Sequence, residues 1–300
     1  MSTWFTASTP PLISIVILRE IRMKLILPQY PNITKFLSAI GHEDTFLHDR
    51  ISNPNYGFWP HLEYFLLNAY RFKNHETIIE RLLLEVPLNM EINKAWAKWQ
   101  KFRSAQSEIT VIYINEMYFS GQVVEIVPVD KKPTPDIKVI LHNCEHLIEI
   151  KAQSGQQHGS KHPRAKGCNS FTPQDELDLK SWLFHEKISS RNDKPMEPKT
   201  LEADKKGADI LVAMTDYFHT GTDIKNEASK ICPGSKYLES KNVKDNEDKP
   251  LIVHFFESAY PISKDLKNLK EIWLFDESHL DRFMVLSREA ILLEHLKNTR

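Results

Sequence analysis

The sequence predicts an α/β fold, in which helices flank a central β-sheet and a helical addition precedes it. Three segments carry this prediction: a helical repeat over 92–112, two β-rich runs joined by a polar turn over 136–151, and a buried-strand pattern over 208–214. Apolar residues recur every three to four positions in the first, whereas β-prone residues dominate the other two. A chain of 300 residues is long enough to bury a full core around such a sheet.

Residues 23–90 are predicted to form a helical accessory domain. Three helices are expected there, over 31–40, 60–72 and 75–85. Gly41 suits a helix C′ position, and Asn74 is placed to cap the third helix. Residues 1–22 are interpreted as a disordered or upstream extension, because Met23 offers an alternative start. The accessory domain either packs on the core or takes part in target binding.

Residues 91–120 carry two conflicting signals. The run over 109–114 has β propensity, which argues for a strand. The apolar period of three to four residues continues through that run, so a helix is favoured. On this helix Glu108 lies on the flank of the apolar stripe, from which it can reach across a sheet face. The alternative for Glu108 is an ordinary solvated glutamate.

The segment over 135–151 organises the rest of the chain, and it reads as a β-hairpin. Two β-rich runs, 136–141 and 146–151, flank a polar stretch over 142–145 that fits a turn. The hairpin is therefore expected to fold about Asn143–Cys144.

Three charged side chains are expected to converge on one face of this hairpin. Side chains alternate along a strand, so Glu149 and Lys151 point one way and Ile150 points the other. The expected turn places Asp136 opposite Lys151, with Glu149 on the diagonal. Each of these charges must be paired, hydrated or bound to a metal if it is buried.

Pro135–Asp136 followed by Glu149–Ile150–Lys151 resembles the signature of the PD-(D/E)xK nuclease superfamily, which is Pro-Asp, a variable gap and Asp/Glu-x-Lys on the adjacent strand. The resemblance covers roughly residues 91–215 and identifies no particular family within the superfamily. It implies a restriction-endonuclease-like core, with a mixed sheet flanked by helices, over 91–300 and an insertion around 215–250.

The resemblance also assigns places to neighbouring segments. Glu108 stands where the first core helix of that superfamily often carries a glutamate facing the metal site. Gly121 then fits the helix C′ position, where a positive φ is needed. The first strand would be 122–128, and 208–214 would be the fourth core strand.

The resemblance implies a metal-dependent phosphodiesterase. Asp136, Glu149 and the main-chain carbonyl of Ile150 would bind Mg²⁺, for which Mn²⁺ would substitute, and Glu108 would bind a second metal or its water. Lys151, close to two anions, should stay charged, orient the attacking water and stabilise the transition state.

The implied function is therefore a Mg²⁺-dependent DNA endonuclease of the restriction, repair or defence kind, with RNA open as a substrate and a homodimer as one assembly. One alternative is a nuclease fold without activity that serves nucleic-acid binding or complex assembly. The other is a coincidental cluster of ion pairs.

A basic loop follows the second strand over 152–167. Lys161, Arg164 and Lys166 suit contact with a phosphate backbone, although most charged loops are simply solvated. Gln153 shares the face of Glu149 by strand alternation, so it could help to hold a water or a phosphate.

A second group of side chains is capable of binding zinc. It comprises His142, Cys144, His146, His158, His162 and Cys168. The group contains neither a CxxC nor an HExxH spacing, so a structural zinc is the weaker interpretation.

The remaining elements alternate between helices and strands. A helix is expected from Thr172 to about Ile188, a linker over 189–200, a short helix over 201–206 ended near Gly207, strands over 251–256 and 271–275, and a helix over 288–297.

Composition limits the setting in which this chemistry would occur. The formal net charge of −1 excludes a wholly basic surface, so nucleic-acid contact must come from a local patch. No apolar run approaches the roughly 20 residues that span a bilayer, so no membrane partner is expected. Three cysteines without paired spacing favour a reducing, cytoplasmic compartment.

Overall fold

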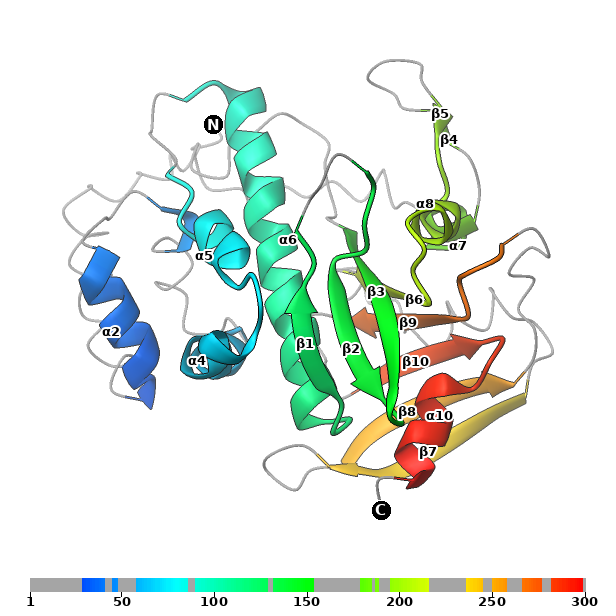
Figure 1. Cartoon of the computed structure of the whole chain (residues 1–300). Coiled ribbons are helices and arrows are strands. Elements are labelled where there is room, and N and C mark those ends of the chain that lie inside the picture. The colour runs from blue at the N-terminus through cyan, green and yellow to red at the C-terminus, as the bar shows by residue number, and fades with distance from the viewer. Residues whose placement is uncertain are drawn as a thin grey trace, which may run out of the picture.

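The computed structural model of the chain describes residues 29–40, 45–47, 58–85, 90–128, 132–153, 179–184, 187–188, 195–215, 236–244, 250–257, 266–276 and 282–298. In this part of the chain, helices flank a central mixed β-sheet (Figure 1), which confirms the predicted α/β class with its N-terminal helical addition. None of the helices described here combines the length and the apolar character that crossing a membrane requires.

The main sheet has eight strands in the order β1-β2-β3-β6-β9-β10-β8-β7. The strands are β1 (Gln122–Ile126), β2 (Ile137–Leu141), β3 (Cys144–Gln153), β6 (Ile210–Thr215), β7 (Lys236–Lys244), β8 (Pro250–Glu257), β9 (Glu271–Asp276) and β10 (Arg282–Ser287). β1, β2 and β3 form an antiparallel meander, and β6 runs parallel to β3. β9 is parallel to β6, β10 is antiparallel to β9 but parallel to β8, and β7 is antiparallel to β8.

The long helix α6 (Ile92–Met117) confirms the choice of helix over strand for its β-prone segment. Ile109, Ile112 and Ile114 are each at most 1% exposed and lie in the same apolar core as β1, β2 and β3. Burial of this apolar stripe against the sheet therefore outweighs the local β propensity.

The predicted left-handed position after α6 is wrong by one residue. Ser120 takes the positive φ of 55°, whereas Gly121 has no such backbone. Gly121 is needed for another reason: a Cβ there would lie 2.7 Å from the Asn115 amide nitrogen and 2.8 Å from Leu141 Cδ2. A side chain at this position would therefore force the side-chain ends of Asn115 and Leu141 to shift.

Three N-terminal helices precede α6; the second and third pack against α6, and the first packs against the second (Figure 1). They are α2 (Pro31–Ile40), α4 (Trp59–Asn68) and α5 (Glu76–Leu82), with a short 3₁₀ turn η2 (Ala69–Arg71) after α4. Their buried residues belong to the same apolar cluster as those of α6 and the first three strands. Gly41 and residues 1–22 lie outside the described residues.

Asn74 does not cap α5 as predicted. Its φ is 62°, and its side-chain amide donates to the Ile126 carbonyl at 3.0 Å. The residue before α5 is His75, whose side chain makes no capping bond. Asn74 therefore ties the N-terminal helices to β1 through a left-handed turn that Asn tolerates better than most residues.

The hairpin of β2 and β3 is present, but its turn is tighter than predicted. His142 and Asn143 have φ values of 50° and 61°, so they form a two-residue turn of the kind that matches strand twist. β3 consequently begins at Cys144, and Ile137 pairs with Ile148. This register shifts the predicted pairing of the two strands by two residues, and the Asp136 N–H donates to the Ile148 carbonyl, so Asp136 does not lie opposite Lys151. Because the side-chain period is also two, the predicted face is kept.

The second half of the chain differs from prediction at α7, at the β4–β5 pair, at β7 and at β10. The structure has α7 (Leu179–Phe184), the short pair β4 (Lys187–Ile188) and β5 (Pro195–Met196), α8 (Lys199–Lys205) and α10 (Ile291–Asn298). The helix expected to reach 188 ends at 184, and β4 pairs with β5 across the expected linker. β7 lies within the predicted insertion and extends the sheet, and β10 was not predicted. Thr172 lies outside the described residues.

The two faces of the sheet contact different helices. Ile148 and Ile150 lie in the core that contains α6, whereas Leu211 and Ala213 lie in a second core with residues of α7 and α8. Glu149 is paired with Leu211 across the parallel strands β3 and β6. Since paired residues share a face, Glu149 points toward α8 and away from the core of α6.

Candidate active site

Asp136 lies immediately before β2, and both its main chain and its side chain form hydrogen bonds with neighbouring strands. Its N–H donates to the Ile148 carbonyl and its carbonyl accepts from the Val127 N–H, each at 2.9 Å. Its carboxylate oxygen Oδ2 accepts the N–H of Ile150 at 2.7 Å, one step beyond the last main-chain pair. The Asp136 carboxylate is therefore fixed against the edge of β3, at the strand position that follows Glu149.

Glu149 is fully buried and its two oxygens have unequal surroundings. Oε1 lies 2.6 Å from the ammonium of Lys151 and 2.6 Å from that of Lys206. Oε2 is buried and has no hydrogen-bond partner among the described residues. A buried carboxylate oxygen without a partner costs free energy, so its presence in a charged cluster indicates a place for a ligand.

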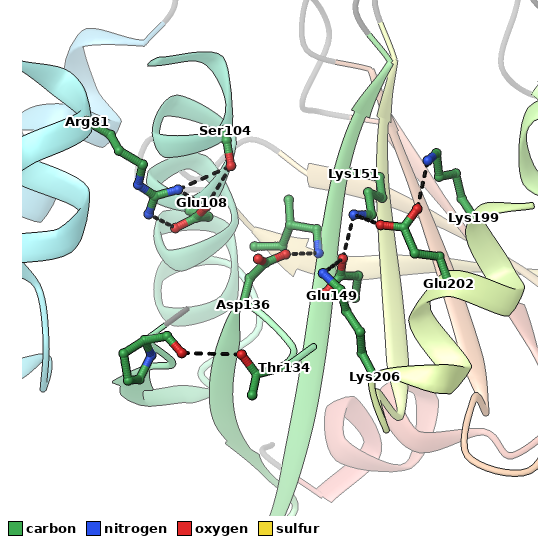
Figure 2. A network of polar contacts seen from close by, with 12 residues as sticks. Arg81, Ser104, Glu108, Thr134, Asp136, Glu149, Lys151, Lys199, Glu202 and Lys206 are labelled. Atoms are coloured by element: carbon green, nitrogen blue, oxygen red, sulfur yellow. Dashed lines mark hydrogen bonds and ion pairs between the residues drawn. The ribbon is translucent and has the colours of Figure 1, made fainter. Parts of the chain in front are cut away.

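Helix α8 holds Lys151 from the other side. Glu202 accepts from Lys151 at 2.5 Å and from Lys199 at 2.7 Å (Figure 2). Burial alone would lower the pKa of Lys151, but Glu149 and Glu202 outweigh it and raise this pKa above its ordinary value. Burial would raise the pKa of Glu202, but Lys151 and Lys199 lower it to about 2. Lys151 therefore stays cationic, as the sequence predicted.

Glu108 points from α6 toward the same region, but its charge is already matched. The guanidinium of Arg81 on α5 donates a hydrogen bond to each Glu108 carboxylate oxygen, at 2.6 and 2.5 Å, and the Ser104 hydroxyl donates to Glu108 at 2.9 Å. Glu108 is only 2% exposed, so this pairing removes a large desolvation penalty. Direct binding of a metal by Glu108 would have to break part of this pairing.

Asp136 lies between the Arg81–Glu108 pair and the Glu149–Lys151 pair (Figure 2). Burial raises its pKa well above the usual value, and the negative charges of Glu108 and Glu149 raise it further. The Ile150 N–H and the charge of Lys206 lower it again by smaller amounts. A carboxylate that is destabilised by other carboxylates is a favourable ligand for a cation.

The donor set fits a hard cation better than a transition metal. Within the described residues, no group of three or more His, Cys, Asp or Glu side chains is arranged to hold a metal ion. Asp136 and Glu149 supply two carboxylates, and the Ile150 carbonyl lies on the same strand edge as the N–H that binds Asp136. Mg²⁺ is commonly held by one or two carboxylates and retains several waters, so these residues fit it.

The remaining predicted site residues fall into two groups. The backbone of Gln153 ends β3, whereas Lys161, Arg164 and Lys166 lie outside the described residues. Of the residues considered for zinc, His142 and Cys144 are exposed at the turn, and His158, His162 and Cys168 lie outside the described part of the chain. His146 Nδ1 lies 4.0 Å from Asp209 Oδ2 and has no hydrogen-bond partner among the described residues.

Four residues of the network were not predicted: Arg81, Lys199, Glu202 and Lys206. The only local signal was the spacing Lys199-x-x-Glu202-x-x-x-Lys206, which places three charges on one face of a short helix. Nothing in the sequence linked that face to Glu149, which lies 57 residues from Lys206.

No family model, curated protein or solved structure matches the chain. The class of protein is therefore inferred from the fold and from this charge network alone.

Proposed function

We propose that the protein is a Mg²⁺-dependent nuclease of the PD-(D/E)xK type that hydrolyses phosphodiester bonds in DNA, with RNA as a second possible substrate. The observation that carries this proposal is the buried oxygen Oε2 of Glu149, which has no hydrogen-bond partner among the described residues. It lies in the same cluster as Asp136 and Lys151. These are the residues at which the sequence resembles the signature of that superfamily.

The order of the elements supports the proposal. α6 is followed by the antiparallel strands β1, β2 and β3, then by α7, the short pair β4–β5 and α8, and then by β6, which runs parallel to β3. A restriction-endonuclease-like core implies this succession, with the acidic residues on the second and third strands.

Each residue of the site has a distinct part in the proposed reaction. Asp136, Glu149 and the Ile150 carbonyl would hold the cation, which when bound supplies Lewis-acid stabilisation of the charge that develops on the phosphate. The ammonium of Lys151 lies 2.6 Å from the same Glu149 carboxylate, so it can orient the attacking water and stabilise the pentacovalent phosphate. Glu202 keeps that ammonium in place and charged.

One observation favours the alternative of an inactive nuclease fold that binds nucleic acid. Lys151 and Lys206 both pair with Glu149, so the carboxylate is already neutralised without a metal. A protein of that kind would bind nucleic acid with a strong dependence on salt and would not cut it.

A cleavage assay distinguishes the two functions. Plasmid, linear duplex, single-stranded DNA and RNA are incubated with Mg²⁺, Mn²⁺ or EDTA, using wild type, Lys151→Ala and the control Lys138→Ala. Lys138 is a suitable control because it lies on β2 and pairs with Glu125 and Glu145 outside the site.

The expected result is cutting that requires the metal, that Lys151→Ala abolishes and that Lys138→Ala retains. Cutting that is equal in both variants would refute the assignment of Lys151. Binding without cutting in every lane would support the inactive fold.

A further inference from the structure

Lys206 is held at the end of α8 by its backbone and reaches the site with its side chain. Its N–H donates to the carbonyls of Glu202 and Ala203, each at 3.2 Å, and Gly207 follows with a φ of 79° that ends the helix. The Lys206 ammonium lies 2.6 Å from Oε1 of Glu149, and its charge lowers the pKa of Asp136. The charge of Lys206 therefore acts on Asp136 and Glu149, the two carboxylates proposed to bind the metal.

The charges of the described network balance without any added ion. The carboxylates are Glu108, Asp136, Glu149 and Glu202, and the cations are Arg81, Lys151, Lys199 and Lys206. A divalent cation that enters this neutral set adds two positive charges. Its binding is favourable only if a resident cation moves away or an anionic substrate arrives.

Lys206 is the resident cation whose departure disturbs the network least. Arg81 is bound to buried Glu108, and Lys151 and Lys199 are both bound to Glu202. The ion pair recorded for Lys206 is with Glu149, the residue that would gain the divalent cation as its new partner. The side chain of Lys206 is 19% exposed, so its ammonium can turn toward solvent.

We infer that Lys206 is the exchangeable counter-ion of the site: its ammonium neutralises Glu149 while no divalent cation is bound, and it competes with that cation for the carboxylate. This inference rests on the proposed function, because it assumes that the cation binds at Asp136 and Glu149. It makes Lys206 a determinant of the cation affinity, a role that the resemblance to PD-(D/E)xK nucleases does not assign to it.

The test is a calorimetric titration of the full chain with MnCl₂ alone, without nucleic acid. Lys206→Met removes the competing charge and keeps most of the length of the side chain, so Mn²⁺ is expected to bind about 5- to 150-fold more tightly, the usual range for coupled binding. Lys206→Arg is expected to weaken Mn²⁺ binding, because a guanidinium can occupy Oε2 of Glu149 as well as Oε1. The control is Lys205→Met, because Lys205 precedes Lys206 on α8 and pairs instead with the partly exposed Glu197.

Each outcome has a defined meaning. Unchanged or weaker Mn²⁺ binding in Lys206→Met, with normal binding in wild type, overturns the inference and shows that Lys206 only braces Glu149. Absence of Mn²⁺ binding in wild type and in every variant overturns the proposed metal site itself, and the inference with it. If Lys206→Met is too unstable to titrate, Lys206→Arg decides, and binding as tight as in wild type or tighter overturns the inference.

Thermal unfolding provides a second readout. Without divalent cation, Lys206→Met should have a lower Tm than wild type, because Glu149 loses one of the two counter-ions that the described residues supply. Saturating Mn²⁺ should remove most of this difference, since the cation takes the place of the ammonium. A difference in Tm that Mn²⁺ leaves unchanged contradicts the exchange.

Discussion

The pairing of Arg81 with Glu108 makes a quantitative prediction about stability. Arg81→Met would remove both charged hydrogen bonds to Glu108, at 2.6 and 2.5 Å, and leave only the bond from Ser104. The Glu108 carboxylate is 2% exposed, so it cannot regain its hydration. Leaving a buried charge without its partner costs about 3–5 kcal/mol. We therefore expect the free energy of unfolding to fall by about that amount.

The double variant Arg81→Met/Glu108→Gln separates the ion pair from the packing of the arginine. Glutamine keeps the shape of Glu108 and can still accept the bond from Ser104, but it carries no charge. The double variant should therefore recover most of the loss, because replacing both partners of a buried pair is often close to neutral. Arg71→Met is the exposed control, since the Arg71–Glu116 pair spans 3.4 Å and should contribute about 1 kcal/mol or less.

The assay is urea unfolding at neutral pH in EDTA, followed by far-ultraviolet circular dichroism. Equal stabilities of wild type and Arg81→Met would refute the reasoning, as would a double variant that is less stable than Arg81→Met. Either result would mean that the pair contributes little to the attachment of α5 to α6.

Three further predictions concern charge and packing elsewhere. Asp136→Asn should raise the stability of the ion-free protein by about 0.5–2 kcal/mol at pH 7, because the pKa of Asp136 is raised and its ionised form opposes folding. This gain should shrink as the pH falls, because Asp136 of the wild type then becomes protonated. A gain that does not depend on pH in urea titrations would contradict this explanation. Burial raises the pKa of Glu271 to about 7, although the hydrogen bonds that it accepts lower this pKa. The free energy of unfolding should therefore fall by about 3 kcal/mol as the pH rises from 4.5 to 7. Glu271→Gln should flatten that dependence, and an unchanged slope would count against this cause. Gly121→Ala should cost about 1–3 kcal/mol, because its Cβ would lie 2.7 Å from the side chain of Asn115 and 2.8 Å from that of Leu141. Chemical unfolding measures this cost, and an unchanged midpoint would show that these two side chains move aside at little cost.

The sequence by itself determined the features that depend on local periodicity. The apolar repeat over 92–112 predicted α6, since burying one continuous stripe outweighs the β propensity of a few residues. The alternation along β3 predicted that Glu149 and Lys151 share a face with Asp136. The register was wrong by two residues, which leaves the faces of the paired residues unchanged, and Asp136 contacts β3 through the Ile150 N–H.

Only the tertiary structure decided which groups meet these residues. The register depended on left-handed backbone at His142 and Asn143, which a polar turn sequence does not specify uniquely. Arg81 reaches Glu108 across 27 residues, and Lys206 reaches Glu149 across 57. Periodicity states which side of an element a residue occupies, whereas the identity of its partner depends on how separate elements pack. The sequence therefore predicted that Glu149 and Lys151 share one face of β3. The cations and carboxylates that pair with the site residues depend on how α5 and α8 pack around the sheet.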